Sequence, residues 1–298
     1  MIDRLELLLA LARERHFGRA AIACGTSQQS LSASLKQLEA QLGTLLVERG
    51  SRFHGFTPEG ERVLDWARRI VGDAHAMQQE LRALKHGLEG HLRIAVIPTA
   101  LPMVQRLTGP YRARFPGVRF TIRSAASEEI LSLLHNLEIE AGITYLDNEP
   151  LGRVASLPLF DERYCLLTAP GGPFENRTSV TWAEAAAQNL CLLTPDMQNR
   201  RILEAHLRVA GAGSAPALQS NSMLLLLSHV RAGGWVGIMP AILAETVDAL
   251  GPIRAIPVIE PSISHRVGLV VPQREVMLPI VDALMRIAAE TVIPQAPS

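Results

Sequence analysis

The sequence has no excess of charge of either sign, since 29 basic residues balance 29 acidic ones. The overall balance therefore points neither to nucleic acid nor to a membrane surface, and any contact with DNA must be argued from local pattern. Apolar runs such as Met223 to Leu227 fall far short of the roughly 20 residues of a transmembrane helix. Charged residues from Asp3 onward interrupt residues 1–15, unlike a secretion signal. We therefore expect a cytoplasmic protein.

Cysteine is scarce, and its three residues are far apart in the sequence: Cys24, Cys165 and Cys191. They form no Cys-x-x-Cys pair and no cluster with histidine, so neither a structural metal nor a disulfide framework is predicted. Buried thiols are the simplest interpretation. The sequence also lacks a nucleophile elbow, a phosphate loop or a metal-ligand spacing in the right context. We therefore predict that the chain is not an enzyme.

The size and composition of the chain predict several folded domains. It has 298 residues, of which 48% are hydrophobic and 19% charged, without a long biased tract. A chain of this length exceeds one ordinary domain, and this composition is typical of globular structure.

The first 45 residues have the pattern of a helix-turn-helix. Apolar residues at helical spacing predict a helix that ends near His16 and a short second helix from Gly18 to Cys24. Gly25 supplies a turn, and Ser27 is placed to cap a third helix. The apolar face of this third helix consists of Leu31, Leu35 and Leu38.

The third helix carries short polar side chains at its N-terminal end, as a helix that reads the major groove does. Gln28 and Gln29 both donate and accept hydrogen bonds and suit base readout, whereas Ser27, Ser30 and Lys36 suit phosphate. Taken alone, such a helix is more often simply a polar surface. The candidate DNA contacts, which include one residue of the following hairpin, are Ser27, Gln28, Gln29, Ser30, Ser32, Ser34, Lys36 and Arg52.

A basic hairpin between Arg49 and Thr57 is suited to contact the DNA backbone or minor groove, as a wing does. Arg52 is the preferred contact. For Arg49 two roles stay open, a DNA contact or an ion pair with Glu39 or Glu48.

A long helix is predicted next, because Thr57 can cap it and Pro58 fits its first turn. Apolar residues then alternate at spacings of four and three, which is typical of a two-stranded coiled coil. A helix ending at Leu88 is about 46 Å long, too long for one small domain. A helix packed inside its own domain is the alternative. The predicted dimer seam is Val63, Ala67, Ile70, Ala74, Met77, Leu81, Leu84 and Leu88.

These N-terminal residues resemble the LysR family of transcriptional regulators. The positions that follow its signature in order and spacing are Phe17, Ala20, Ala21, Ser27, Gln28, Leu31, Ser32, Leu35, Leu38, Glu39, Leu42, Gly43, Leu46, Arg49, Thr57 and Gly60. Val47 stands where the family usually has Phe, and Gln29 where Pro is frequent. The resemblance covers the whole layout, and it implies a winged helix-turn-helix, DNA binding and assembly into tetramers.

The remaining residues predict an α/β domain that begins near residue 90. Strand-like segments alternate with helical ones, which favours mostly parallel sheets. The expected strands after the first, at Leu92 to Ile97, are 118–123, 139–145, 164–168, 190–194, 235–239 and 266–271.

The resemblance implies a two-lobed, periplasmic-binding-protein-like fold for this domain. The expected division of the chain is 1–57 for the DNA-binding domain, 58–89 for the linker helix, 90–160 and 263–298 for lobe I, and 161–262 for lobe II.

An effector site is expected between the lobes, where helix N-termini and strand ends converge. Thr99 and Ala100 follow the first strand, and Ser127 follows the second. Both hydroxyls are equally suited to ordinary capping. A carboxylate or another small anion is the expected ligand, with no other cofactor. The candidate effector contacts are Thr99, Ala100, Ser127, Thr194, Met197, Gln198 and Asn221.

Three classes of function are compared. A ligand-responsive regulator accounts for every segment, whereas a solute-binding receptor or an unrecognised enzyme leaves the first ninety residues unexplained. Residues 145–151 resemble regulators associated with formate dehydrogenase operons. The expected partners are promoter DNA, further copies of the chain and RNA polymerase.

Overall fold

The computed structural model describes residues 1–48, 53–211, 215–243 and 253–291. The chain forms two compact units. The first, here called the head, contains Met1–Glu89 together with His135–Glu138 and Arg274–Ile280, and the effector unit contains the rest of the described chain. Among the described residues, no helix has the length and apolar character needed to cross a membrane.

The head is built from helices whose starts and ends follow from local sequence: α1 (Ile2–Glu14), α2 (Phe17–Ala23), α3 (Gln28–Leu42) and α4 (Pro58–His86). The Ser27 hydroxyl accepts a hydrogen bond from Ser30 N at 3.1 Å, and Thr57 Oγ1 accepts one from Gly60 N at 2.9 Å. Both predicted caps are therefore confirmed. The cap of α2 is His16, whose Nδ1 accepts from Gly18 N at 3.1 Å, and the sequence analysis missed it.

The head has one apolar core, which the leucines of α1 and α3 dominate. Leu31, Leu35 and Leu38 of α3 are buried against Leu8 and Leu11 of α1. On the outer side of this contact, the Arg4 guanidinium donates hydrogen bonds to the side-chain oxygens of two glutamines of α3, at 2.7 and 2.9 Å. The packed leucines and these hydrogen bonds therefore hold α3 against α1.

Two short arms of a hairpin connect α3 to α4. Val47 and Phe56 form an antiparallel bridge, and Glu48 N donates to Gly55 O at 3.0 Å. The base of this hairpin lies against the first turn of α4, where a Cβ on Gly60 would be 2.0 Å from Leu46 O. Only glycine permits this approach. The tip, with Arg49 and Arg52, is outside the described residues.

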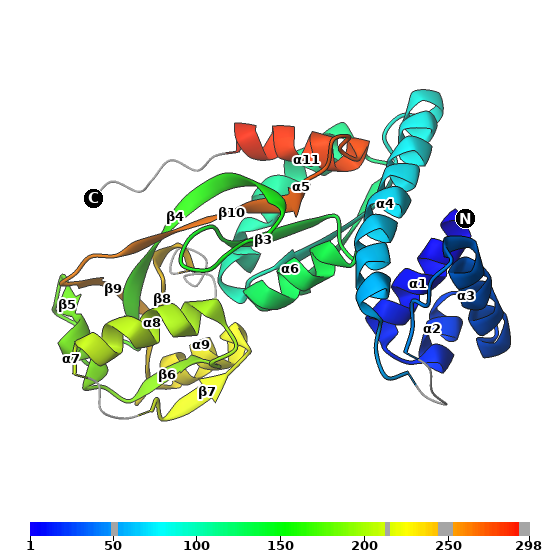
Figure 1. Cartoon of the computed structure of the whole chain (residues 1–298). Helices are drawn as coiled ribbons and strands as arrows, with labels where there is room; N and C mark the ends of the chain where they lie inside the picture. Colours follow the sequence, from blue (N-terminus) through cyan, green and yellow to red (C-terminus); the bar gives the residue numbers. More distant parts are fainter. Residues whose placement is uncertain (49–52, 212–214, 244–252, 292–298) are drawn as a thin grey trace. The chain divides into compact units, whose positions relative to one another are not determined.

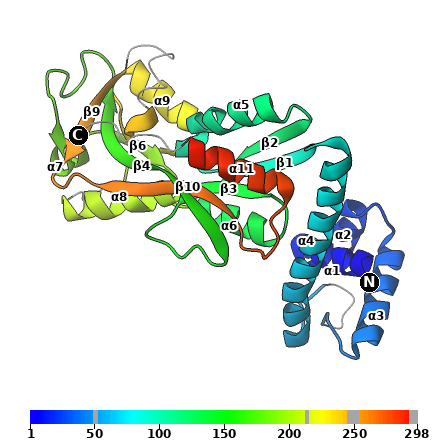
Figure 2. The same ribbon diagram turned by 90° about the horizontal axis from the view of Figure 1, so that it is seen from above.

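Lobe I of the effector unit is an α/β layer structure (Figures 1 and 2). Strands β1 and β2, and β1 and β3, pair in parallel. In Figure 1, α5 and α11 lie on one face of the sheet and α6 on the other. Its elements are β1 (Gly90–Val96), η1 (Pro98–Met103), α5 (Gln105–Arg114), β2 (Val118–Ser124), α6 (Ser127–His135), β3 (Ala141–Tyr145) and α11 (Pro279–Glu290).

Lobe II has a similar arrangement around β8, β6 and β7. Strand β6 pairs in parallel with both β7 and β8. Its core contains Cys191, Leu193 and Val230. The elements are β5 (Val180–Thr181), α7 (Trp182–Ala186), β6 (Leu190–Leu193), α8 (Gln198–Val209), β7 (Leu218–Ser220), α9 (Met223–Ala232), β8 (Val236–Pro240) and β9 (Arg254–Ile259).

Two long strands join the lobes, β4 (Val154–Thr168) and β10 (Ser264–Pro272). They pair antiparallel with each other, so the strand order is β2-β1-β3-β10-β4-β8-β6-β7. The expected parallel pairing therefore holds for the pairs that contain neither crossing strand, whereas each pair that contains β4 or β10 is antiparallel. The sequence analysis also missed the first half of β4 and the short strands β5, β7 and β9, because short or edge strands carry little apolar pattern.

Candidate functional site

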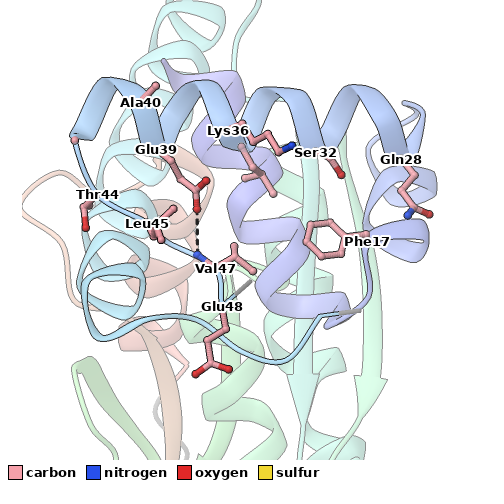
Figure 3. Close-up of a pocket in the computed structure, with 12 residues that line it drawn as sticks. Phe17, Gln28, Ser32, Lys36, Glu39, Ala40, Thr44, Leu45, Val47 and Glu48 are labelled. Carbon is pink, nitrogen blue, oxygen red and sulfur yellow. Dashed lines mark hydrogen bonds between the residues drawn. The ribbon is translucent and has the colours of Figure 1, made fainter. Parts of the chain in front are cut away.

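The exposed face of α3 is the first candidate site. Gln28, Ser32 and Lys36 recur every four residues, and because a helix turns by about 100° per residue they share one side. With Phe17 and Glu39 they line a groove of about 900 Å³ between α3 and the first arm of the hairpin (Figure 3). Gln29 lines the adjoining surface with Ser32 and Lys36. These side chains provide donors and acceptors that match base edges, and one cation for phosphate.

The other predicted DNA contacts of α3 lie elsewhere on the helix. Ser30 and Ser34 are rotated by a third of a turn or more from Gln28, and neither lines the groove. The Ser27 and Ser30 hydroxyls are 2.8 Å apart and are engaged in capping the helix. The structure therefore brings together only part of the predicted set, Gln28, Gln29, Ser32 and Lys36.

Glu39 positions the hairpin and was not recognised as doing so from sequence. Its Oε1 accepts hydrogen bonds from the backbone N–H groups of Leu46 at 2.8 Å and Val47 at 3.3 Å. The carboxylate thus ties the end of α3 to the first arm of the hairpin, as Figure 3 shows. Arg49, for which an ion pair with Glu39 is one of the two predicted roles, is outside the described residues.

The α4 helix has two apolar sides. Leu64, Ala67 and Val71 are buried in the head's own core, and Val63 packs against it. Ala74 and Leu88 of the predicted seam are half-buried. Four large apolar residues of that seam are instead exposed, between 40% and 80% of their surface: Ile70, Met77, Leu81 and Leu84.

A buried polar cluster where the lobes meet is the second candidate site. Glu162 of β4 is 1% exposed, and its Oε1 accepts a hydrogen bond from the Tyr145 hydroxyl of β3. Asn199, in the first turn of α8, donates from Nδ2 to the Tyr145 hydroxyl at 3.1 Å and to Glu162 Oε1 at 3.4 Å. This cluster therefore connects both lobes through the crossing strand.

Burial controls the ionisation of this cluster. It raises the pKa of Glu162 from 4.5 to about 7, although hydrogen bonds from Tyr145 and its neighbours act in the opposite direction. Burial also raises the pKa of Tyr145 and Tyr164 well above 10, so both phenols are neutral donors. Such a perturbed carboxyl group, with charge-neutral donors on several elements, is typical of a ligand site.

Several polar atoms of the effector unit are buried without a hydrogen-bond partner. They are Glu162 Oε2, the hydroxyls of Thr99, Ser127, Thr144, Tyr164 and Thr194, and His265 Nε2. Buried polar atoms in native proteins are nearly always bonded to protein, water or a ligand. Of these residues, Thr99, Tyr164 and His265 lie next to the cluster with Glu162, which favours a place that binds something polar.

The predicted effector residues divide into three groups. Thr99, Ser127 and Gln198 are buried, and Ala100 lies beside Thr99 in η1. Thr99 lies next to Glu162, and Gln198 precedes Asn199 of the cluster in α8. Thr194 has a buried hydroxyl but is itself half-buried.

Met197 and Asn221 depart from the expected role. Met197 packs in the apolar core of lobe II, and Asn221 is exposed. Neither contributes to the polar cluster. Glu162, Tyr164 and His265 were missed, although a glutamate within a strand of buried apolar residues is itself a signal.

Further contacts hold α8 of lobe II against lobe I. Gln198 Nε2 donates to Asp147 O at 3.1 Å. The Arg201 guanidinium makes two parallel hydrogen bonds of 2.8 Å to Glu149 and lies 3.6 Å from Glu128. Bidentate pairs of this kind fix geometry as well as charge. The lobes are therefore held together by polar bonds at the mouth of the cluster.

The cysteines of the effector unit lie apart from one another. Cys165 is in β4 and Cys191 in β6, and β8 runs between these strands. Two strand spacings are about 9 Å, which exceeds the reach of a disulfide. Burial raises the pKa of Cys165 to about 12 and that of Cys191 to about 11. Cys24 is exposed, at the end of α2.

A helix-turn-helix with an open polar helix face, followed by a long helix and a two-lobed α/β unit with a buried polar cluster, defines a transcription regulator with a sensor domain. The chain belongs to the LysR family. Residues 2–61 match the bacterial regulatory helix-turn-helix protein, lysR family, and residues 85–292 match the LysR substrate binding domain. The chain is thus a DNA-binding transcription regulator and not an enzyme.

The relatives of this chain include regulators named OxyR and hydrogen peroxide-inducible genes activators. The chain is 29% identical over 270 residues to the DNA-binding transcriptional dual regulator OxyR of Escherichia coli K12, covering 90% of this chain and 88% of that one. It is 33% identical over 193 residues to a probable hydrogen peroxide-inducible genes activator of Mycobacterium avium, covering 64% and 62%. These relatives give no support to the predicted formate association.

Solved structures have the same architecture. A full-length OxyR cysteine variant from Pseudomonas aeruginosa superposes with a TM-score of 0.74 at 25% identity, covering 98% of this chain and 97% of that one. The LysR family regulator CbnR superposes with a TM-score of 0.61 at 18% identity over 99% of this chain and all of that one. The predicted fold class is confirmed.

Proposed function

We propose that the chain binds a partly palindromic promoter site through the α3 face formed by Gln28, Gln29, Ser32 and Lys36. The observation that carries this proposal is the open groove on that face, set against a fully buried leucine face on the other side of the helix. Arg52 remains a proposed wing contact. Promoter binding implies a location in the cytoplasm, where RNA polymerase is a further proposed partner.

The test is binding of the purified protein to its own upstream intergenic DNA. An unrelated duplex of equal length serves as control at the same physiological salt concentration, since affinity from charge alone is nonspecific. We expect a preference of about a thousandfold or more. Equal affinity for both duplexes, with the protein folded, would contradict the proposal.

We further propose that α4 dimerises the protein and that dimers pair into tetramers. The support is the stripe of exposed Ile70, Met77, Leu81 and Leu84, which a second copy of the helix can cover. Met77→Glu combined with Leu81→Glu should give monomers in sedimentation, whereas Glu80→Gln, on the same helix, should leave the assembly unchanged. A dimer that survives the double variant would remove this stripe from the interface.

The effector of the proposed regulator binds where the two lobes meet. Thr99, Ser127 and Gln198 are buried there around unpartnered polar atoms, which supports a small polar ligand. The sequence prediction of a carboxylate rests on helix N-termini alone, and that of a formate-related pathway on residues 145–151 alone. Ligand binding then alters lobe closure, and it can do so only through different affinity for the open and closed forms.

Peroxide response is a second candidate, because several relatives are named activators of hydrogen peroxide-inducible genes. A thiol switch needs an accessible thiolate. With pKa values of about 12 and about 11, Cys165 and Cys191 are almost wholly protonated at neutral pH, and a strand separates them. We therefore propose that a response of this chain to peroxide would not depend on the thiol of Cys165 or Cys191. Peroxide-dependent DNA binding that disappears in Cys165→Ser or Cys191→Ser would contradict this.

A further inference from the structure

The charge of Glu162 is the feature of the effector unit that lacks an explanation. It is the one buried acidic residue among those the structure describes. None of its hydrogen bonds comes from a lysine, arginine or histidine; its donors are a phenol and an amide. A buried carboxylate without a cationic partner is costly, and proteins retain such groups mainly where they have a function.

The two oxygens of this carboxyl group differ. Oε1 accepts from both Tyr145 and Asn199, whereas Oε2 is buried and has no partner. Both donors to Oε1 favour the ionised form, since each gives a hydrogen bond to the charged group. Oε2 therefore has no hydrogen bond of ordinary geometry, although the Thr99 and Tyr164 hydroxyls lie next to the carboxyl group.

Two hydroxyl groups and one imidazole lie near this carboxyl group. The Thr99 and Tyr164 hydroxyls lie close enough to lower the pKa of Glu162, yet neither makes a hydrogen bond of ordinary geometry. The imidazole of His265 lies 6.1 Å from the Tyr164 ring, and its Nε2 is also unpartnered. The nearby arginine at the cleft mouth, Arg201, is already bound to Glu149.

This distribution of charge is unfavourable for the anion expected from sequence. When Glu162 is ionised, a carboxylate placed here would be repelled by it, because two like charges repel strongly in a medium of low dielectric constant. A cation with N–H groups is instead attracted to the ionised Glu162 carboxylate. It compensates the buried charge and donates to Oε2, while the hydroxyls accept its remaining hydrogens.

We propose that the effector carries a protonated amine, a small primary ammonium group that donates hydrogen bonds to Oε2 of Glu162. The inference rests on the proposed function, in which the effector binds between the lobes. It replaces the expected carboxylate by a ligand of opposite charge at the same place.

The experiment is saturation-transfer NMR of the full-length protein with probes that all carry a methyl group. Methylammonium and n-butylammonium are the ammonium probes. Tetramethylammonium has the charge without N–H, acetamide has N–H without charge, and acetate has the opposite charge. We expect saturable binding of the two ammonium probes and none of the three others at equal concentration.

The variant that tests the contact is Glu162→Gln, and Glu129→Gln on the exposed surface of α6 is its matched control. Loss of a charge-assisted hydrogen bond predicts at least about tenfold weaker ammonium binding in Glu162→Gln. Circular dichroism and binding to the upstream duplex establish that each variant is folded. Glu129→Gln should bind the probes as the wild type does.

Each other outcome overturns the inference. Stronger binding of acetate returns the site to an anion, equal binding of tetramethylammonium makes the contact purely coulombic, and no ammonium binding means that buried water alone completes the cluster. If the upstream duplex is still preferred in these cases, only the ligand inference fails. If that preference is absent, the proposed function fails independently of the probes.

Discussion

The head and the effector unit use polar side chains in opposite ways. In the head, Gln28, Ser32 and Lys36 stand in solvent on one side of a helix whose other side is apolar. In the effector unit, Glu162, Tyr145 and Asn199 are buried and come from three separate elements. A site for a large partner needs an accessible surface with a rigid support, whereas a site for a small ligand needs enclosed atoms whose bonding is incomplete.

The largest expected effect tests whether DNA binding by the exposed side of α3 depends on the packing of its buried side. Leu38→Ala removes a fully buried side chain from the head core. We expect the free energy of unfolding of the head to fall by about 3 to 5 kcal/mol, because a cavity is left behind. Calorimetry should show this loss together with loss of specific DNA binding.

The control for this prediction is Leu42→Ala, in the last turn of the same helix. Leu42 is 42% exposed, so its truncation should cost about 1 kcal/mol or less. Equal losses in both variants would mean that the two sides of α3 do not differ in the way described.

The second prediction concerns the buried carboxyl of the effector unit. Folding raises the pKa of Glu162 from 4.5 to about 7 through burial, so the folded state holds this proton where the unfolded state has released it. Its contribution to stability is complete below pH 4.5 and is lost as the pH rises to 7, by roughly 3 kcal/mol. Urea denaturation at several pH values measures the change.

Glu162→Gln serves as the reference, because an amide does not titrate. The groups next to this carboxyl are Tyr145, Tyr164, Thr99 and Asn199, and none of them titrates between pH 4.5 and 7. The imidazole of His265 also lies near both tyrosine rings, and it is present in the wild type and in the variant alike. The wild type should therefore lose stability relative to the variant across this interval. A constant difference would show that Glu162 does not hold its proton.

The third prediction separates the two polar edges of α3. Gln28→Ala should weaken binding to the specific duplex by about 1 to 3 kcal/mol, the usual value of a two-point base contact. Ser34→Ala should leave affinity unchanged, because Ser34 lies away from the groove. Fluorescence anisotropy on both duplexes distinguishes them. A larger loss for Ser34→Ala would place the DNA on the other edge.

The smallest expected effect concerns the cap of the recognition helix. Ser27→Ala removes the acceptor for Ser30 N and should lower the stability of the head by about 1 kcal/mol. Ser27→Gly should cost only a few tenths, since glycine is itself an acceptable cap. Thermal unfolding of the two variants provides the measurement. If both lose the same amount, the hydroxyl does not act as the cap.

The sequence was informative wherever a signal is local. Ser27, Thr57 and Pro58 mark helix starts by side-chain chemistry, and the spacing of Leu31, Leu35 and Leu38 sets the buried face. Exposure on α3 then follows, because a helix with one apolar side has its other side in water. The sequence did not separate Gln28 from Ser34, since both belong to the polar part of the same helix.

The effector site was predicted less completely, and the reason is its origin in distant segments. Thr99 and Ser127 were recognised because each starts a helix after a strand. Glu162, Tyr164 and His265 carry no such mark. Met197 and Asn221 were predicted because they lie in a loop and at a helix start. In the structure Met197 packs in the core of lobe II, and Asn221 is exposed.

The sequence by itself determined the helices of the head, the caps of α3 and α4 and the resemblance to the family, because periodicity and short-range hydrogen bonding act within a few residues. The tertiary structure alone decided which polar atoms are left without partners. Glu162 and Asn199 meet only because β4 crosses between the lobes and α8 begins beside Asp147. The charge that selects a ligand depends on burial, and burial depends on the whole fold.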